Sequence, residues 1–322
     1  MGKTSIEWAA NADGTPGATW NPIRGCSRIS SGCTRCYAER MASRFSAEGE
    51  PFHQFAERTP SGPRWTGRVE LIPEMLDIPL RRRKPTTYFV NSMSDLFHEA
   101  LPDEVIDRVF AVMALCPQHR FICLTKRGER MAEYCENRPP AQAVADLADA
   151  LGLTPRCVRP NPYLPVGRQW WPLPNCILGV SCEDRKNLDR LDHLRATPAV
   201  CRVVSFEPLL EDLGTVNLDG IGWAIVGGES GPGARPMQIE WARSIVAQCQ
   251  SAGVACFVKQ LGARPVGELC ADPLDGWPNG VHLDRDDLPP YGVRYCLASS
   301  KGGDPDEWPE DLQVRERPEV LK

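Results

Sequence analysis

The sequence predicts an α/β fold: a (β/α) barrel, complete or partial, with six to eight parallel strands. Short, nearly continuous apolar runs recur along the chain, as expected of strands that a parallel sheet buries on both faces. Segments with helical periodicity separate these runs, and this alternation is typical of repeated βα units. The residues just past the apolar runs can hydrogen-bond or carry charge, which predicts a functional face at the carboxyl ends of the strands.

The runs that we expect to form strands are residues 69–72, 87–91, 120–125, 176–181, 201–206, 223–228 and 255–260. The helical patterns between them cover residues 34–45, 102–115, 183–194 and 239–250. In the second of these helices, Pro102 occupies a favoured first-turn position, and Val105, Val109 and Val112 recur near helical spacing. Elements in this order are expected of a barrel built from consecutive βα units.

Two segments fall outside this alternation. Residues 136–175 hold eight prolines and the pair Trp170–Trp171, and we expect an insertion or lid there. Residues 263–322 are rich in proline and acidic residues, and we expect an irregular extension packed on the barrel. The barrel itself would then occupy residues 1–262.

Composition restricts the class of function. The 322 residues carry a net charge of −5, which argues against tight non-specific binding of duplex DNA but leaves room for a local basic site. The 14 cysteines are scattered, and the N-terminus lacks an apolar signal segment, which is typical of reduced cysteine in a cytoplasmic protein. No apolar stretch reaches the roughly 18 residues of a membrane span, so we expect no membrane partner.

Three cysteines near the N-terminus are the strongest functional signal. Cys26, Cys33 and Cys36 are spaced C-x6-C-x2-C, and a glycine directly precedes each of the first two. Three thiolates without a nearby fourth ligand indicate a metal centre with an open coordination position. Cysteine thiolates are the usual ligands of iron–sulfur clusters, so we expect these three residues to hold a cluster whose free iron can bind a small molecule.

Two other interpretations of the cysteines are possible. A structural zinc ion takes four ligands, and the early candidates for a fourth are His53 and His98, neither at zinc-finger spacing. Three thiols that only pack as small apolar groups would not explain the glycines or the loop setting. Zinc therefore stays as the alternative metal.

Charge and glycine also gather locally. The residues 227–233 are glycine-dense, so their backbone N–H groups could cradle a phosphate or carboxylate, although a strand-end turn would use glycine in the same way. A second group, Arg24, Arg28, Arg35, Arg40 and Arg44, surrounds the cysteines and could stabilise thiolates or hold a nucleotide phosphate. The run 81–84 is basic as well, and a solvated turn explains it.

Six motifs, in order, connect the chain to a known group of proteins. They are the cysteine loop with Thr19–Pro22 before it, Asn91–His98, Leu124–Arg127, Ser205–Leu209, Gly227–Gly231 and Lys301–Asp304. Together they resemble the phage-associated three-cysteine-motif proteins, which are similar to radical S-adenosylmethionine enzymes. The resemblance covers most of the chain apart from residues 136–175.

The resemblance implies a radical-SAM-like barrel with a [4Fe–4S] cluster on Cys26, Cys33 and Cys36. S-adenosylmethionine would bind the fourth iron, and an external one-electron reductant would trigger its cleavage to a 5′-deoxyadenosyl radical. The chain departs from the common C-x3-C-x2-C pattern, which has an aromatic residue before the last cysteine. Here the first gap is six, Arg35 occupies the aromatic position, and Tyr37 follows the last cysteine.

The resemblance also suggests a substrate. Some phage enzymes of this type look like isomerases of thymidine hypermodification, which convert a glycine linked through nitrogen to the thymine methyl carbon into a carbon-linked form. The substrate would be a modified nucleotide or phage DNA, in the cytoplasm of the host. The alternatives are a radical lyase that repairs or remodels a nucleobase, and a non-catalytic, zinc-binding phage accessory protein.

The expected site residues lie at or near successive strand ends. For S-adenosylmethionine we expect contacts from Tyr37, Ser92, Asp95, Ser181, Glu207, Gly227 and Gly228. For the substrate and its chemistry we expect Lys126 and Lys259, with Glu229 and Arg235 as further substrate contacts. Asp95 or Glu207 could accept a hydrogen bond from the methionyl ammonium. Cys182 is a candidate hydrogen-atom donor, with burial as a small apolar residue as its alternative role.

Overall fold

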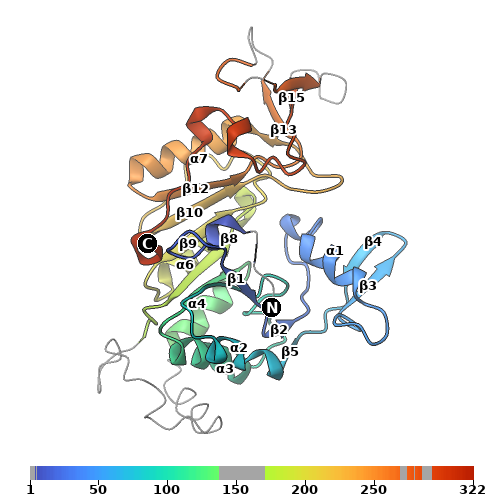
Figure 1. Cartoon of the computed structure of the whole chain (residues 1–322), viewed down its shortest axis with the longest axis vertical. Coiled ribbons are helices and arrows are strands. Elements are labelled where there is room, and N and C mark those ends of the chain that lie inside the picture. Colours follow the sequence, from blue (N-terminus) through green and yellow to red (C-terminus); the bar gives the residue numbers. More distant parts are fainter. Residues whose placement is uncertain (1–3, 5, 138–170, 269–273, 279, 285–291) are drawn as a thin grey trace.

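The structure is a computed structural model, and it describes residues 4, 6–137, 171–268, 274–278, 280–284 and 292–322. Its centre is a seven-stranded parallel sheet that curls into a half-barrel (Figure 1). The strands follow one another in chain order: β1 (Ala18–Trp20), β6 (Thr87–Val90), β7 (Arg120–Thr125), β8 (Cys176–Ser181), β9 (Arg202–Phe206), β10 (Trp223–Gly227) and β12 (Ala255–Gln260). The expectation of an α/β fold with a partial barrel is confirmed at this level.

Six of these strands, all except β1, lie in apolar runs that the sequence analysis predicts as strands. The seventh predicted strand, residues 69–72, was wrong. Residues 69–72 contribute only β5 (Glu70–Leu71), which pairs antiparallel with β2 (Ile23–Arg24) outside the main sheet. The side chain of Glu70 is exposed and Leu71 is half-buried, unlike a central strand. The sheet instead begins with β1, whose three residues are too short to show a pattern.

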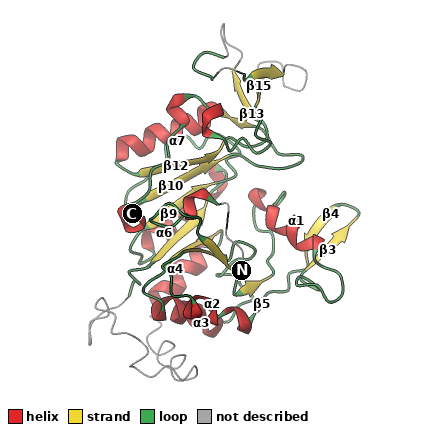
Figure 2. Ribbon diagram, in the orientation of Figure 1, coloured by secondary structure: helices red, strands yellow, loops and turns green. Residues whose placement is uncertain are grey.

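Four helices of the structure lie in the segments that the sequence predicts as helical, but their first and last residues differ from the predicted ones. They are α1 (Tyr37–Arg44), α3 (Asp103–Leu115), α6 (Arg190–Ala196) and α7 (Ile239–Ala252); the structure adds α2 (Asp77–Arg81) and α4 (Gly128–Asn137), which the sequence analysis did not foresee (Figure 2). The helix expected from residue 183 begins only at Arg190, because a 3-10 turn, η4 (Arg185–Asn187), precedes it. No described helix is both long and apolar enough to cross a bilayer.

Alternate residues of each strand enter two separate apolar clusters. One cluster joins the sheet to the helices and contains Cys123, Val180, Val204 and Val226. The other lies on the opposite face and contains Ile122, Ile177, Val203, Ile225 and Phe257, packed with Trp8 and Leu321. The second cluster therefore fills the amino-terminal half of the half-barrel's inner face. Further along each strand, the same inner face continues to the carboxyl ends of the strands. We call this end of the inner face the mouth.

The C-terminal part contains more regular structure than the sequence analysis expected. A four-stranded sheet has the order β11 (Met237–Gln238), β13 (Pro265–Glu268), β15 (Gly292–Cys296) and β14 (His282–Asp284). Further on, residues 314–316 run antiparallel along β12: the Val258 N–H donates to the Val314 carbonyl at 2.8 Å, and the Glu316 N–H donates to the Cys256 carbonyl at 2.8 Å. Most of the expected insertion, residues 138–170, lies outside the described residues.

One hairpin stands apart from the sheet. It consists of β3 (Ala56–Thr59) and β4 (Gly62–Trp65), and α1 packs beside it (Figure 1). The arrowheads of β10 and β12 in Figure 1 point to the right of the view, the side of the molecule on which α1 lies. The thiol loop, residues 25–36, leads into α1 and so lies between the mouth and this hairpin.

Candidate functional site

The thiol loop is anchored to strand ends of the half-barrel. Gly25 forms a parallel bridge with Ser94, four residues after β6, and the Ser94 hydroxyl donates to the Ile23 carbonyl at 2.9 Å. Further along the loop, the Ser31 carbonyl accepts a hydrogen bond from Arg235 at 2.9 Å. The cysteines are therefore held at the carboxyl ends of the strands, the face on which the sequence placed the functional groups.

The two glycines that precede cysteines are required by close packing. Gly25 has a φ of +91°, and a Cβ on it would lie 1.9 Å from the carbonyl oxygen of Arg68. A Cβ on Gly32 would lie 2.8 Å from the carboxyl carbon of Glu183. Any larger residue would push the loop away from its supports at both points.

A buried carboxylate, Glu183, fixes the middle of the thiol loop. It follows β8 and accepts hydrogen bonds from the Ser30 hydroxyl and, at 3.1 Å, from the Gly32 N–H. Its other oxygen pairs with Arg190 at 2.9 Å and with Lys126 at 3.6 Å. Burial alone would raise the pKa of Glu183, but Lys126, Arg190 and the loop donors outweigh burial and hold that pKa below its usual value. Glu183 is thus an ionised anchor for the loop.

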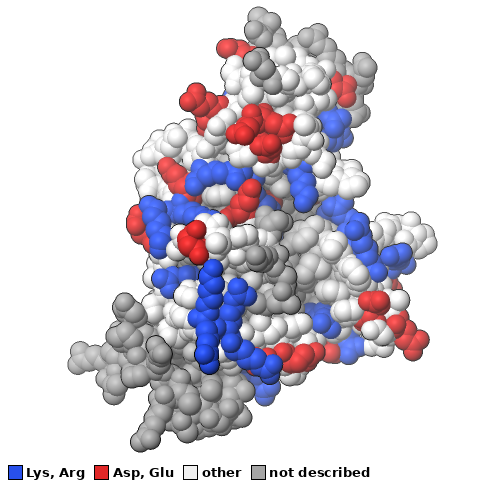
Figure 3. Space-filling view, viewed as in Figure 1, with Lys and Arg blue, Asp and Glu red and all other residues white. Residues whose placement is uncertain are grey.

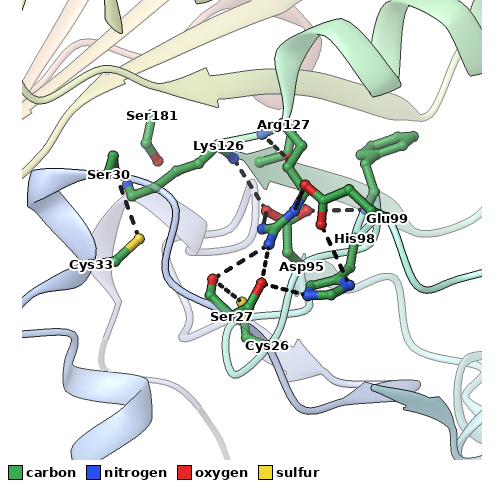
Figure 4. A network of polar contacts seen from close by, with 12 residues as sticks. Cys26, Ser27, Ser30, Cys33, Asp95, His98, Glu99, Lys126, Arg127 and Ser181 are labelled. Carbon is green, nitrogen blue, oxygen red and sulfur yellow. Dashed lines mark hydrogen bonds and ion pairs between the residues drawn. The ribbon is translucent and has the colours of Figure 1, made fainter. Parts of the chain in front are cut away.

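A second network fixes the loop beside Cys26 (Figure 4). Arg127 donates to Asp95 at 3.0 Å, to Glu99 at 2.8 Å and to the Ser27 hydroxyl at 2.8 Å. His98 Nδ1 accepts from the Ala100 N–H at 3.1 Å, so its Nε2 carries the proton and donates to Ser27 at 2.8 Å. Burial and the nearby Arg127 lower the pKa of His98, which favours this neutral form.

The three thiols are free, half-buried and electrostatically coupled. The pKa of the Cys26 thiol is raised to about 12: burial is the largest cause, Asp95, Cys36 and Cys33 act in the same direction, and Arg127 opposes them. Burial also raises the pKa of Cys36, against the backbone N–H groups that open α1 and the charge of Lys126. Among the described residues, no three His, Cys, Asp or Glu side chains lie close enough together to surround one metal ion. The three thiols are therefore close enough to influence one another's charge, but they are not arranged to coordinate one metal ion together.

Alternation along the strands places most of the expected residues at the mouth. The inner-face positions continue from Leu124, Gly179, Ser205, Ile225 and Phe257 to the carboxyl ends, where they reach Lys126, Ser181, Glu207, Gly227 and Lys259. Figure 4 shows Lys126 and Ser181 beside Ser30 of the thiol loop. These five predicted site residues therefore occupy one face of the sheet, and their roles stay predictions.

The mouth contains an ion pair between Glu207 and Lys259, both partly exposed. Gln260 supports the same carboxylate at 3.4 Å and donates to the Gly228 carbonyl at 2.8 Å. The Tyr37 hydroxyl donates to the carbonyl of Ser92, which lies two residues past the end of β6. Two expected cofactor contacts, Tyr37 and Ser92, are therefore in direct contact.

The glycine-dense loop packs tightly at Gly228, whereas Gly231 and Pro232 line a cavity together with Gly262, Arg294 and Lys301. A Cβ on Gly228 would lie 2.5 Å from the Leu261 carbonyl oxygen, so this glycine serves the contact with the end of β12. Glu229 binds Arg235 through both carboxylate oxygens, and Arg235 continues to the thiol loop. Glu229 and Arg235 therefore brace the loop in addition to any role toward a substrate.

Two expected residues are placed differently from the others. Cys182 is one position past Ser181, so it faces the helix-side cluster; it is fully buried, and its thiol donates to the Asn187 carbonyl at 3.2 Å. Asp95 is buried and accepts from the Phe97 N–H, the Thr125 hydroxyl, the Lys126 N–H and Arg127. These four bonds use the acceptor capacity of Asp95 within the protein, which leaves Glu207 as the carboxylate that faces the mouth.

Sequence reasoning missed Glu183, Arg127 and Ser27 as part of the site. Each makes its important contact with a segment far away in the chain, such as the contact of Glu183 with Gly32, 151 positions earlier. For Arg127 and Glu183 the sequence does carry a signal, the polar residues that end β7 and β8, of which the sequence analysis selects Lys126, Ser181 and Cys182.

The fold and the loop define the class of protein: a parallel α/β half-barrel that carries three free thiols at the carboxyl ends of its strands. Residues 3–284 match a family described as "Protein of unknown function (DUF5131)", and the chain belongs to that family. Neither a curated protein nor a solved structure matches the chain.

Proposed function

We propose that the protein is a radical S-adenosylmethionine enzyme whose [4Fe–4S] cluster is bound by Cys26, Cys33 and Cys36. The observation that carries the proposal is the placement of three free thiols on one braced loop at the mouth of a parallel half-barrel. Active sites of such barrels lie at this face.

The surroundings of the thiols suit a cluster. Each of the three thiolates would bind a different iron, so the thiols need one neighbourhood and not a single-ion shell. Arg127 beside Cys26 and Lys126 beside Cys36 offset negative charge, and the first N–H groups of α1 point toward the Cys36 sulfur. When bound and reduced, the cluster would supply the electron that cleaves S-adenosylmethionine.

The polar groups of the mouth suit an α-amino acid. Glu207 can accept from an ammonium group while Lys259 binds a carboxylate, and the two already lie together as an ion pair. Both S-adenosylmethionine and a glycine-bearing nucleoside contain such a pair of charges. Tyr37, Ser92, Ser181 and Gly227 would complete the cofactor's surroundings, and Lys126 would stand between the thiols and Glu183.

As the specific reaction we propose the isomerisation of a glycyl-modified thymidine from the nitrogen-linked to the carbon-linked form. A radical on the glycine α-carbon is stabilised by the adjacent nitrogen and carbonyl, so it is a suitable intermediate. A radical lyase that acts on a nucleobase would use the same mouth. A zinc-bound accessory protein would use the thiols without this chemistry.

The decisive experiment combines metal analysis with turnover. Anaerobic reconstitution should give about four iron and four sulfide per chain. Reduced enzyme incubated with S-adenosylmethionine and candidate modified nucleosides should form 5′-deoxyadenosine and, with the true substrate, an isomer of unchanged mass. A cleaved base would identify the lyase, and stoichiometric zinc without iron uptake would contradict the radical proposal.

A further inference from the structure

Exposed apolar side chains concentrate on one element. The large hydrophobic residues that are exposed in the described part of the chain are Ile29, Tyr37, Met41, Phe45 and Val200. All but the last lie on the thiol loop or on α1 and the residue that ends it. Tyr37, Met41 and Phe45 recur every four residues, so they form one stripe along the helix, about 12 Å long at ~1.5 Å per residue.

Arginines flank this stripe. Arg35 and Arg44 are exposed, and Arg40 donates to the carbonyls of Ser230 and Pro232. None of these three guanidinium groups has a carboxylate partner among the described residues, whereas Arg28 is paired with Glu39. Figure 3 shows Lys and Arg side chains over α1 and the hairpin beside it, with a group of Asp and Glu side chains below them. We call Arg35, Tyr37, Met41, Arg44 and Phe45 the α1 platform.

The platform begins at the mouth. Tyr37 follows Cys36 directly, and its hydroxyl donates to Ser92 at the end of β6, while 48% of the residue stays exposed. From there the stripe leads outward along α1 to Phe45. A surface that starts at the reaction site and runs away from it suits a ligand that extends beyond the reacting group.

We propose that the α1 platform binds a single strand of DNA next to the modified base and so presents that base to the mouth. The choice of DNA rests on the proposed function. Stacking side chains combined with unpaired cations are the means by which proteins hold single strands. An acidic partner protein would also meet the charge, but it would not require continuity with the mouth. With a net charge of −5, the molecule needs such a local surface to hold a polyanion.

The test uses the reconstituted full-length protein and a fluorescently labelled single-stranded oligonucleotide of about 15 nucleotides. Anisotropy titrations should give at least about fivefold weaker binding for Phe45→Ala, because stacking on one ring is lost. Phe45→Tyr, which keeps a ring, should bind as the wild type does. Arg44→Gln should reduce the slope of log K against log salt by about 0.7, the contribution of one phosphate contact.

Matched controls are available on the same chain. Val200→Ala removes an exposed apolar side chain elsewhere, and Arg83→Gln removes an exposed arginine from the other basic run; both should leave binding unchanged. Iron content and S-adenosylmethionine cleavage without DNA should be the same in all variants. If the wild-type protein took up no iron, the proposed function would be contradicted. The DNA-binding titrations would still test the α1 platform independently.

Two results would overturn the inference. In the first, Phe45→Ala and Arg44→Gln bind the oligonucleotide as tightly as the wild type, and both turn over a free modified nucleotide normally. In the second, the variants keep DNA binding but lose reduction by an acidic electron-transfer protein. That result would assign the platform to the electron donor.

Discussion

At the level of single residues, the site depends on side chains that hold the thiol loop in place. Glu183 is fully buried between two cations and two loop donors, so the thiol loop and the end of β8 form one charged unit. Arg127 performs the same task beside Cys26 through Asp95, Glu99 and Ser27. The cysteines therefore depend on charges that none of their own neighbours in the sequence supplies.

Glu183→Gln should destabilise the protein by about 3 kcal/mol at pH 7, because Arg190 and Lys126 lose their buried counter-charge. The pKa of Glu183 is lowered in the folded state, so its stabilisation is complete above the unfolded pKa near 4.3 and disappears as pH falls through the lower folded value. Urea unfolding between pH 7 and pH 3 should show a smaller pH dependence for the variant. Glu70→Gln, which removes an exposed ion pair, should leave the pH dependence of the unfolding free energy as in the wild type. The same pH dependence for Glu183→Gln and the wild type would refute this account.

Gly32→Ala should reduce iron uptake several-fold. The added Cβ meets the Glu183 side chain, which two cations prevent from moving, so the loop between the first two cysteines must shift instead. Gly303→Ala is the matched control, since a Cβ there has its nearest contact at 4.0 Å. Iron per chain after reconstitution is the measurement, and normal uptake by Gly32→Ala would show that the loop tolerates the displacement.

At the level of elements, the sequence predicted strands well where burial on both faces leaves a continuous apolar run, as in the predicted strands 176–181 and 223–228, which correspond to β8 and β10. It could not predict β1, whose three residues have no measurable pattern, and it misplaced residues 69–72, whose pairing partner is decided by the tertiary fold. The same limit applies to the site. Alternation of side chains along β8 predicts that Ser181 and Cys182 lie on opposite faces of the sheet. Only the packing of the helices against one face shows which residue lies on the inner face of the half-barrel.

The edge of the sheet at β12 yields a prediction about the C-terminal segment. Residues 314–316 pair with β12 and cover its edge, and Arg315 lies over Phe257 at 5.1 Å from the ring centre. Glu316→Pro removes the N–H that donates to Cys256, so it should lower the melting temperature and increase light scattering on heating. Glu319→Pro, at an exposed first position of the last 3-10 turn, should change neither. Equal behaviour of the two variants would mean that this pairing does not protect the edge.

At the level of the whole molecule, the half-barrel separates stability from function along the strand axis. Trp8 and Leu321, which come from opposite ends of the described chain, fill the inner face toward the amino ends of the strands. The mouth at the other end holds ion pairs and the thiol loop instead of apolar packing. A ligand bound there would join elements that otherwise meet only through these polar contacts.

This arrangement predicts that S-adenosylmethionine stabilises the protein only when the cluster is present. A ligand at a hundred times its Kd adds about 2.7 kcal/mol to the free energy of unfolding, which for a chain of this size raises Tm by roughly 5 °C. Reconstituted wild type should show this shift in calorimetry. Cys33→Ala should not show it, whereas Cys116→Ala, which alters a buried thiol remote from the loop in sequence, should show it in full. An equal shift for Cys33→Ala would mean that the cofactor binds without iron, and the thiol loop would then need another role.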